Sequence, residues 1–150
     1  NCDSELILTI SPGPLYACTT FTIPANKDLQ CVIDGKIWKQ TRVPIRKLDN
    51  ILKEQKCFQI PNLVKIDVEG YELEVLRGAT SILGKTEVFI LEVLLQAGVV
   101  KGASMGEISS FMESHGYRLY DFADLGYHCQ TGELLTLDAV YVRQDSKLWH

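Results

Sequence analysis

The spacing of apolar residues predicts a chain that starts with strands and continues with alternating strands and helices. Short apolar runs indicate strands, whereas apolar residues three and four positions apart indicate helices. The predicted strands are 5–10, the two arms of 30–43, 63–68, 86–94, 117–122 and 134–144. Asp34 and Gly35 separate the two arms of 30–43, and such a pair is typical of a β-hairpin. We expect Pro44 to end the second arm, because proline lacks an amide hydrogen.

Three segments have helical spacing. The first is Arg46–Gln55, and the second begins near Tyr71 and has Gly84 as its predicted C-terminal cap. The third follows Ser104, which forms a capping-box pattern with Glu107. The segments between these elements, 15–28, 96–103 and 123–133, are predicted to be an irregular loop, a flexible loop and a long polar connection.

The order of the elements predicts an α/β fold. Residues 63–94 read as strand, helix, strand, which is a βαβ unit with an expected right-handed crossover. The near-continuous apolar runs of its two strands predict burial on both faces. The last two predicted strands have no helix between them, so we expect them to pair antiparallel. The pattern therefore predicts the back half of an open α/β sheet that ends in an antiparallel hairpin.

Length and composition limit the class of protein. The 150 residues suit a single α/β domain, with a β-rich segment at 1–45, the α/β part at 46–143 and a tail at 144–150. No apolar run approaches the roughly 20 residues of a membrane helix. The net charge of −4, with scattered basic residues, argues against nucleic acid as a partner. Five cysteines without a C-x-x-C pair, and no secretory signal, indicate reduced thiols and a cytoplasmic protein.

Acidic residues follow the two strands of the βαβ unit, where α/β proteins bind ligands. Asp67 and Glu69 lie at the end of the first strand and Glu92 lies near the end of the second, which is consistent with one crevice. They could orient or deprotonate a hydroxyl, or bind a cation. Glu69 and Glu72 could instead stabilise a helix N-terminus. Asp67 favours a site, because an acid inside an apolar strand needs a partner.

Other polar residues support a site less strongly. Asp138 lies among apolar residues, and Arg118 on the neighbouring strand is its expected partner. Lys65 is expected to snorkel or to pair rather than to catalyse. His128 and Cys129 lack further ligands at metal spacing, so we predict no metal site. The chain contains neither a G-x-G-x-x-G nor a G-x-x-x-x-G-K-[ST] phosphate loop, and no G-x-S-x-G nucleophile motif.

The stretch VKIDVEGYELEVLRGA, residues 64–79, resembles the signature of the FkbM-type methyltransferases. The matching residues are Lys65, Ile66, Asp67, Val68, Glu69, Gly70, Glu72, Val75, Leu76, Gly78 and Ala79. The stretches RVPIRKLDNIL before it and VFILEV after it extend the resemblance over roughly 40–142. The resemblance implies a Rossmann-like class I methyltransferase sheet. It also implies an enzyme that uses S-adenosylmethionine to methylate a hydroxyl of a small molecule or glycan.

The resemblance also implies roles for the acidic residues. Asp67 would lie nearest the reacting methyl group and orient or deprotonate the acceptor, and Glu69 would lie beside it and shape the turn. Glu92 and Tyr71 are expected to contact the substrate. No residue is assigned to the cofactor, because the family's D-x-G-A-x-x-G loop and E-P pair do not occur in the 150 residues.

We therefore expect the C-terminal half of a methyltransferase, with the fourth to seventh strands of the sheet, that is inactive alone and binds cofactor poorly. The start at Asn1 rather than methionine indicates a processed or cut end. An alternative is a non-catalytic α/β module that binds a partner or forms a homo-oligomer through an exposed sheet edge. A metal-dependent hydrolase that uses Asp67, Glu69 and Glu92 is a weaker alternative, because no histidine accompanies them.

Overall fold

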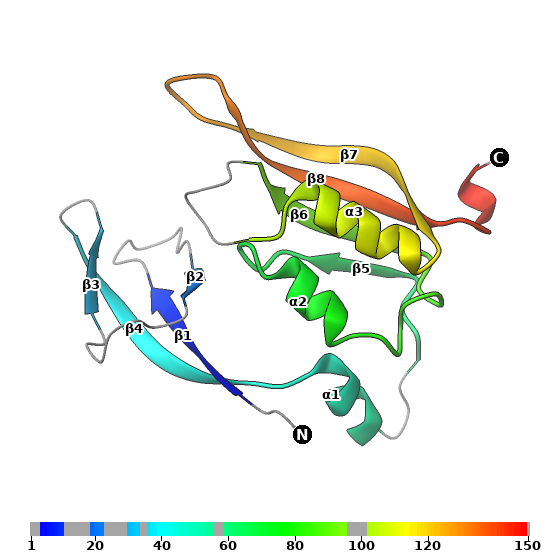
Figure 1. Cartoon of the computed structure of the whole chain (residues 1–150), viewed down its shortest axis with the longest axis horizontal. Coiled ribbons are helices and arrows are strands. Elements are labelled where there is room, and N and C mark those ends of the chain that lie inside the picture. The colour runs from blue at the N-terminus through cyan, green and yellow to red at the C-terminus, as the bar shows by residue number, and fades with distance from the viewer. Residues whose placement is uncertain are drawn as a thin grey trace. The chain divides into compact units, whose positions relative to one another are not determined.

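The structure is a computed structural model that describes residues 4–10, 19–22, 30–33, 36–55, 59–95 and 102–149. Side chains are described from residue 44 onward, with the same gaps. Contacts between residues divide the chain into two compact units, Asn1–Lys47 and Leu48–His150, shown in Figure 1. The prediction of a single domain stays a prediction.

The first unit is a four-stranded antiparallel sheet. Its strands are β1 (Ser4–Ile10), β2 (Thr19–Thr22), β3 (Gln30–Ile33) and β4 (Lys36–Ile45), in the spatial order β2-β1-β4-β3. The predicted pairing of β3 with β4 is confirmed, since Ile33 lies opposite Lys36. Asp34 and Gly35, the predicted turn, lie outside the described residues.

Two predictions for the first unit need correction. β2 lies inside the predicted irregular loop, because its β-branched Thr residues pair with β1. Pro44 does not end β4, which continues to Ile45. Pro44 pairs only with β1, opposite Glu5, beyond the Lys36–Lys39 stretch that pairs with β3. A proline is tolerated in a stretch of strand that pairs on one side, because its nitrogen can face the side without a partner strand.

The second unit is a mixed four-stranded sheet with helices. Its elements are α1 (Leu48–Glu54), β5 (Leu63–Ile66), α2 (Glu72–Arg77), β6 (Val88–Leu94), α3 (Met105–Ser114), β7 (Tyr117–Tyr127), β8 (Leu134–Arg143) and the 3₁₀ helix η1 (Lys147–Trp149). The strand order is β5-β6-β8-β7. β5 and β6 are parallel, and β8 is antiparallel to both β6 and β7. The predicted βαβ unit and the antiparallel final pair are confirmed.

One face of this sheet packs against α2 and α3, which both lie on the near side of the sheet in Figure 1. The side chains of Phe89, Leu91 and Val93 on β6 are fully buried and form a core with Leu76 of α2 and Ile108 of α3. The alternate positions of β6 are only partly buried. The prediction that both faces of this strand are buried is therefore wrong.

β5 is also less buried than its sequence predicts. It lies at the edge of the sheet, and Leu63 is 53% exposed. Only Ile66 of the strand is buried. An apolar run thus reports the hydrophobicity of a strand but does not determine how many of its faces are covered.

The predicted cap of the second helix is wrong, because α2 ends at Arg77 and Gly78 is its C-cap. Asp49 of α1 explains the early end. Its carboxylate accepts hydrogen bonds from the Ser81 amide at 2.9 Å and the Thr80 hydroxyl at 2.7 Å. Gly84 lies in the following turn with φ of 73°, and its amide donates to the Tyr117 hydroxyl at 3.0 Å.

The third helix, α3, begins after Ser104, as the sequence predicts. The Ser104 amide donates to the Glu107 carboxylate at 2.8 Å, and the Ser104 hydroxyl accepts from the Glu107 amide at 3.3 Å. This is the predicted capping box. Ile108 and Met112 form the buried side of α3. Among the described helices, none has the length and apolar character needed to cross a membrane.

The last hairpin is longer than predicted. β7 continues to Tyr127, so the connection to β8 is shorter than the predicted 123–133. Polar residues such as Asp121 and Asp124 can occupy this strand because most of β7 is exposed. Residues after β8 also pack, since Ser146 is buried and the Trp149 indole donates to the Arg143 carbonyl at 2.8 Å.

Candidate functional site

The acidic joint between β5 and α2 is a tight turn. The strand ends at Ile66, and Glu69 and Gly70 then adopt left-handed backbone conformations with φ of 54° and 97°. Gly102 approaches this turn so closely that an added Cβ would lie 2.9 Å from the Gly70 Cα. Only glycine fits that approach without displacing backbone. The turn therefore sets the direction in which the side chains of Asp67 and Glu69 leave the chain.

The buried side chain of Glu72 accepts hydrogen bonds from the backbone of this turn. Its side chain is almost fully buried at 2% exposure. Its Oε1 accepts hydrogen bonds from the Val68 amide at 3.0 Å and the Gly70 amide at 3.2 Å. Glu72 is thus an anchor for the turn as well as an acid in the first turn of α2. The sequence pattern indicated its place at the helix start but not these two hydrogen bonds.

The structure brings three of the four predicted site residues together. Carboxylate oxygens of Asp67, Glu69 and Glu92 lie within 4.8 Å of one another. Glu92 belongs to β6, which pairs in parallel with β5, so the carboxyl ends of both strands meet at this place. Tyr71 is not part of the group; it is the half-buried N-cap residue of α2. Burial raises the pKa of the Tyr71 phenol.

Crowding of these acids changes their proton affinity. Burial, followed by the charges of Asp67 and Glu69, raises the pKa of Glu92 to about 7. Hydrogen bonding to Asp67 and the charge of Glu72 act in the same direction. Burial, and then the charges of Asp67 and Glu72, also raise the pKa of Glu69. A carboxyl with a pKa near neutral can exchange a proton under physiological conditions.

Lys65 connects the joint to β8. Its Nζ lies 3.2 Å from Oδ2 of Asp67 and 3.0 Å from Oδ2 of Asp138. The predicted pairing of Lys65 is confirmed, but Asp138 pairs with this lysine rather than with Arg118. Strand register explains the difference, because Arg118 lies opposite Val142 whereas Asp138 lies opposite Glu92 and Ala123.

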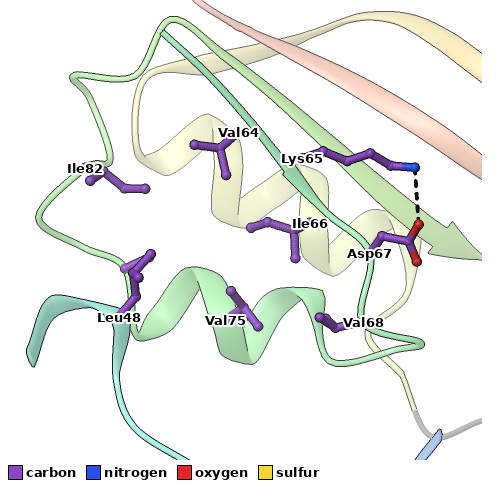
Figure 2. A pocket seen from close by; sticks show the side chains of 9 residues that line it. Leu48, Val64, Lys65, Ile66, Asp67, Val68, Val75 and Ile82 are labelled. Atoms are coloured by element: carbon purple, nitrogen blue, oxygen red, sulfur yellow. Dashed lines mark ion pairs between the residues drawn. The ribbon is translucent and has the colours of Figure 1, made fainter. Parts of the chain in front are cut away.

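A largely apolar pocket of about 460 Å³ adjoins the site. The residues that line it are Leu48, Val64, Lys65, Ile66, Asp67, Val68, Val75, Ala79 and Ile82. In Figure 2 the ion pair of Lys65 and Asp67 lies at the side of the pocket away from Leu48 and Ile82. The pocket therefore has a polar end beside the acidic joint and an apolar remainder against α1 and α2.

The acidic group alone does not define a metal site. Its oxygens lie close enough to approach one cation, but exposed acidic groups commonly gather without one. Within the described side chains, the group contains no histidine or cysteine. We assign no metal to it. The residues that the structure describes also include no glycine-rich loop of the kind that cradles a nucleotide.

The second unit is a mixed α/β sheet whose parallel βαβ unit carries acids at its strand ends, an arrangement that is compatible with a methyltransferase fold. The chain belongs to the FkbM methyltransferase domain family, whose model matches residues 17–119. It is 54% identical over 39 residues to the hexuronic acid methyltransferase AglP of Haloferax volcanii. This match covers 26% of the chain and 16% of the relative. No solved structure matches the chain.

Proposed function

We propose that this chain is the acceptor-binding part of an S-adenosylmethionine-dependent methyltransferase that methylates a hydroxyl of a small molecule or glycan. The observation that carries the proposal is the grouping of Asp67, Glu69 and Glu92 within 4.8 Å, in a chain of the FkbM family. Carboxylates in this arrangement can bind a hydroxyl and take its proton. The adjoining pocket offers an apolar surface for the rest of the acceptor.

The sheet supports the C-terminal half of a Rossmann-like methyltransferase fold. A parallel pair, β5 and β6, is followed by the antiparallel strands β8 and β7. Among the described strands, β5 pairs only with β6, so its other edge is open to further strands. We propose that the remaining half of the sheet pairs with this edge.

The residues of this chain fit the acceptor side of the reaction better than the cofactor side. S-adenosylmethionine supplies a methyl group on a cationic sulfur, and the acidic joint would favour a cation nearby. A cradle for its nucleoside is not encoded, since the glycine-rich loop of the family is missing from the sequence. We therefore propose that the cofactor is held mainly by residues outside these 150.

The chain's own residues would bind and orient the acceptor. The carboxylates of Asp67 and Glu92 would accept hydrogen bonds from the hydroxyl, and one of them would take its proton. Glu69 would shape the turn through its left-handed backbone. Tyr71, at the start of α2, would contact the acceptor at the rim.

Hexuronic acids are the acceptor class that we propose to test first. The reason is the 54% identity to a protein named as a hexuronic acid methyltransferase, over 39 residues. A cytoplasmic location also remains a proposal, supported by cysteine usage alone.

Two measurements on S-adenosylmethionine test the proposed function. Calorimetric titration into the 150-residue chain is expected to give no saturable heat at micromolar cofactor, because the cradle is missing. The intact protein encoded by the surrounding reading frame is expected to transfer a methyl group to a hexuronic acid glycan, detected by mass spectrometry.

Asp67→Asn in the intact protein is the matched variant, because asparagine keeps the shape of the side chain and removes its charge. We expect slower turnover or weaker acceptor binding. Wild-type turnover in this variant would contradict a role for Asp67. Micromolar binding by the chain alone would contradict our account of the cofactor, and a lack of methyl transfer by the intact protein would contradict the function.

A non-catalytic module that pairs with itself is the second candidate. The edge position of β5, with Leu63 53% exposed, favours it. Sedimentation velocity over a range of concentrations would then show a dimer, and Leu63→Lys would reduce it because a charge on an edge strand disfavours pairing. A monomer at all concentrations would exclude this candidate.

A further inference from the structure

Lys65 is a cation that contacts the acidic site through Asp67. It projects from β5 and reaches two acids on different elements, Asp67 after β5 and Asp138 on β8. The Asp138 side chain is only 13% exposed, so its charge needs a partner nearby. Lys65 therefore contacts a partly buried acid on one side and a site residue on the other.

Glu92 has a different environment, although it is a neighbour of the same residues. It lies directly opposite Asp138 in the pairing of β6 with β8. No ion pair within the described part of the chain reaches Glu92. Its Oε2 is buried and has no hydrogen-bond partner among the described residues. Glu92 is thus surrounded by acids while the nearby lysine binds two of them.

We propose that Lys65 is a positioning residue, which fixes the Asp67 carboxylate at the end of β5 and leaves Glu92 as the carboxylate that takes the acceptor's proton. This inference rests on the proposed function. It assigns different roles to Asp67 and Glu92, which the sequence alone does not distinguish. Asp67 binds and orients the hydroxyl, whereas Glu92 is the general base.

The proton balance is simple. The acceptor oxygen loses its bond to hydrogen as it gains a methyl group, and the proton passes to the Glu92 carboxylate. The electron pair of the broken carbon–sulfur bond stays on the donor sulfur. A group whose pKa lies at about 7 suits this task, because a substantial fraction is ionised at neutral pH.

Within the described residues, four acids surround Glu92. The charges of Asp67, Glu69 and Glu72 raise its pKa, and Asp138 lies opposite it on β8. Lys65 on β5 contacts two of these acids, Asp67 and Asp138. Loss of this cation leaves the charges of both acids uncompensated and is therefore expected to strengthen proton binding by Glu92.

The first test is an NMR titration of the Glu92 side-chain carboxyl in the 150-residue chain. In Lys65→Met we expect its midpoint to rise, because the charges of Asp67 and Asp138 are then no longer compensated by the lysine. Lys65→Arg keeps that charge and is expected to restore a midpoint near the wild-type value. Lys85→Met is the control, because Lys85 is exposed and precedes the opposite end of β6.

An unchanged midpoint in Lys65→Met, or an equal rise in the Lys85 control, would overturn the role of Lys65. A rise that Lys65→Arg does not reverse would also overturn it, because the charge would then not be the cause. This titration needs neither cofactor nor activity, so its result stands whether or not the proposed function is correct.

The second test is methyl transfer by the intact protein as a function of pH. Glu92→Gln is expected to lower kcat by about 10²–10⁴-fold, the usual contribution of a general base. Asp67→Asn is expected to raise KM more than it lowers kcat. Lys65→Met is expected to move the acidic limb of the pH profile to higher pH, and Lys65→Arg to return it.

Wild-type kcat in Glu92→Gln would overturn the assignment of the base. A larger loss of kcat in Asp67→Asn than in Glu92→Gln would reverse the two roles. No methyl transfer by the wild-type intact protein would reject the proposed function and the catalytic role of Glu92 together, while the titration would still decide whether Lys65 controls the proton on Glu92.

Discussion

Glu92→Gln is expected to stabilise the chain at pH 8 by about 1–3 kcal/mol and to change its stability little at pH 4. Folding raises the pKa of Glu92 from 4.5 to about 7, so the folded state binds a proton that the unfolded state releases. Each unit of pKa corresponds to about 1.4 kcal/mol, and the partial exposure of the side chain reduces the total. Glutamine resembles the protonated acid at every pH.

The sign of this effect follows from the direction of the shift. The contribution of protonated Glu92 is complete below about pH 4.5, the unfolded value, and is lost as pH rises through about 7. Wild type should therefore lose stability over this window, whereas Glu92→Gln should lose less. Urea unfolding of both proteins between pH 4 and pH 8 measures the difference.

Asp138→Asn provides the matched control on the opposite strand. Asp138 binds Lys65 at 3.0 Å, so its removal is expected to destabilise the chain at pH 8, opposite to Glu92→Gln. A difference between Glu92→Gln and wild type that is the same at all pH values would show that packing is its cause. Destabilisation by Glu92→Gln at pH 8 would contradict the raised pKa.

Glu72→Ala is expected to lower the free energy of unfolding by about 2–4 kcal/mol. The buried carboxylate accepts from the Val68 and Gly70 amides, and its removal leaves both donors without that acceptor. A buried donor left unsatisfied costs about 1–3 kcal/mol. The effect should also reach the site, because these amides belong to the turn that carries Glu69.

Glu72→Gln separates the hydrogen bonds from the charge. The amide oxygen of glutamine can still accept, so we expect it to retain most of the stability. Glu74→Ala is the control on the same helix, since Glu74 is exposed and its surface ion pair with Arg77 should contribute little. Denaturant unfolding measures all three variants. Equal losses in Glu72→Ala and Glu74→Ala would show that the two hydrogen bonds do not stabilise the turn.

Several features of the chain could be predicted from sequence because neighbours along the chain produce them. The capping box at Ser104 and Glu107 requires only residues three apart. The strand–helix–strand order of 63–94 follows from apolar spacing and from the turn at Gly70. The family signature lies in the same stretch, and the family match over 17–119 agrees with it.

The sequence predictions are wrong where contacts between residues far apart in the chain determine the structure. Apolar spacing continues beyond Arg77, but α2 ends there, and Asp49 binds Ser81 and Thr80 across about thirty residues of chain. Burial of β5 and β6 on both faces was predicted from hydrophobicity, yet β5 is an edge strand and the described helices cover one face. Local propensity contains no information about which neighbours a strand will have.

In the candidate site too, some features follow from local sequence and others from contacts between distant residues. That acids follow both strands of a βαβ unit could be predicted from sequence, because strand ends and turn residues are local features. The approach of Asp67, Glu69 and Glu92 within 4.8 Å of one another, and the pairing of Lys65 with Asp138, arise only in the folded sheet. The physical reason is strand register: side chains from β5, β6 and β8 meet only after the three strands have paired, and pairing depends on the whole sheet.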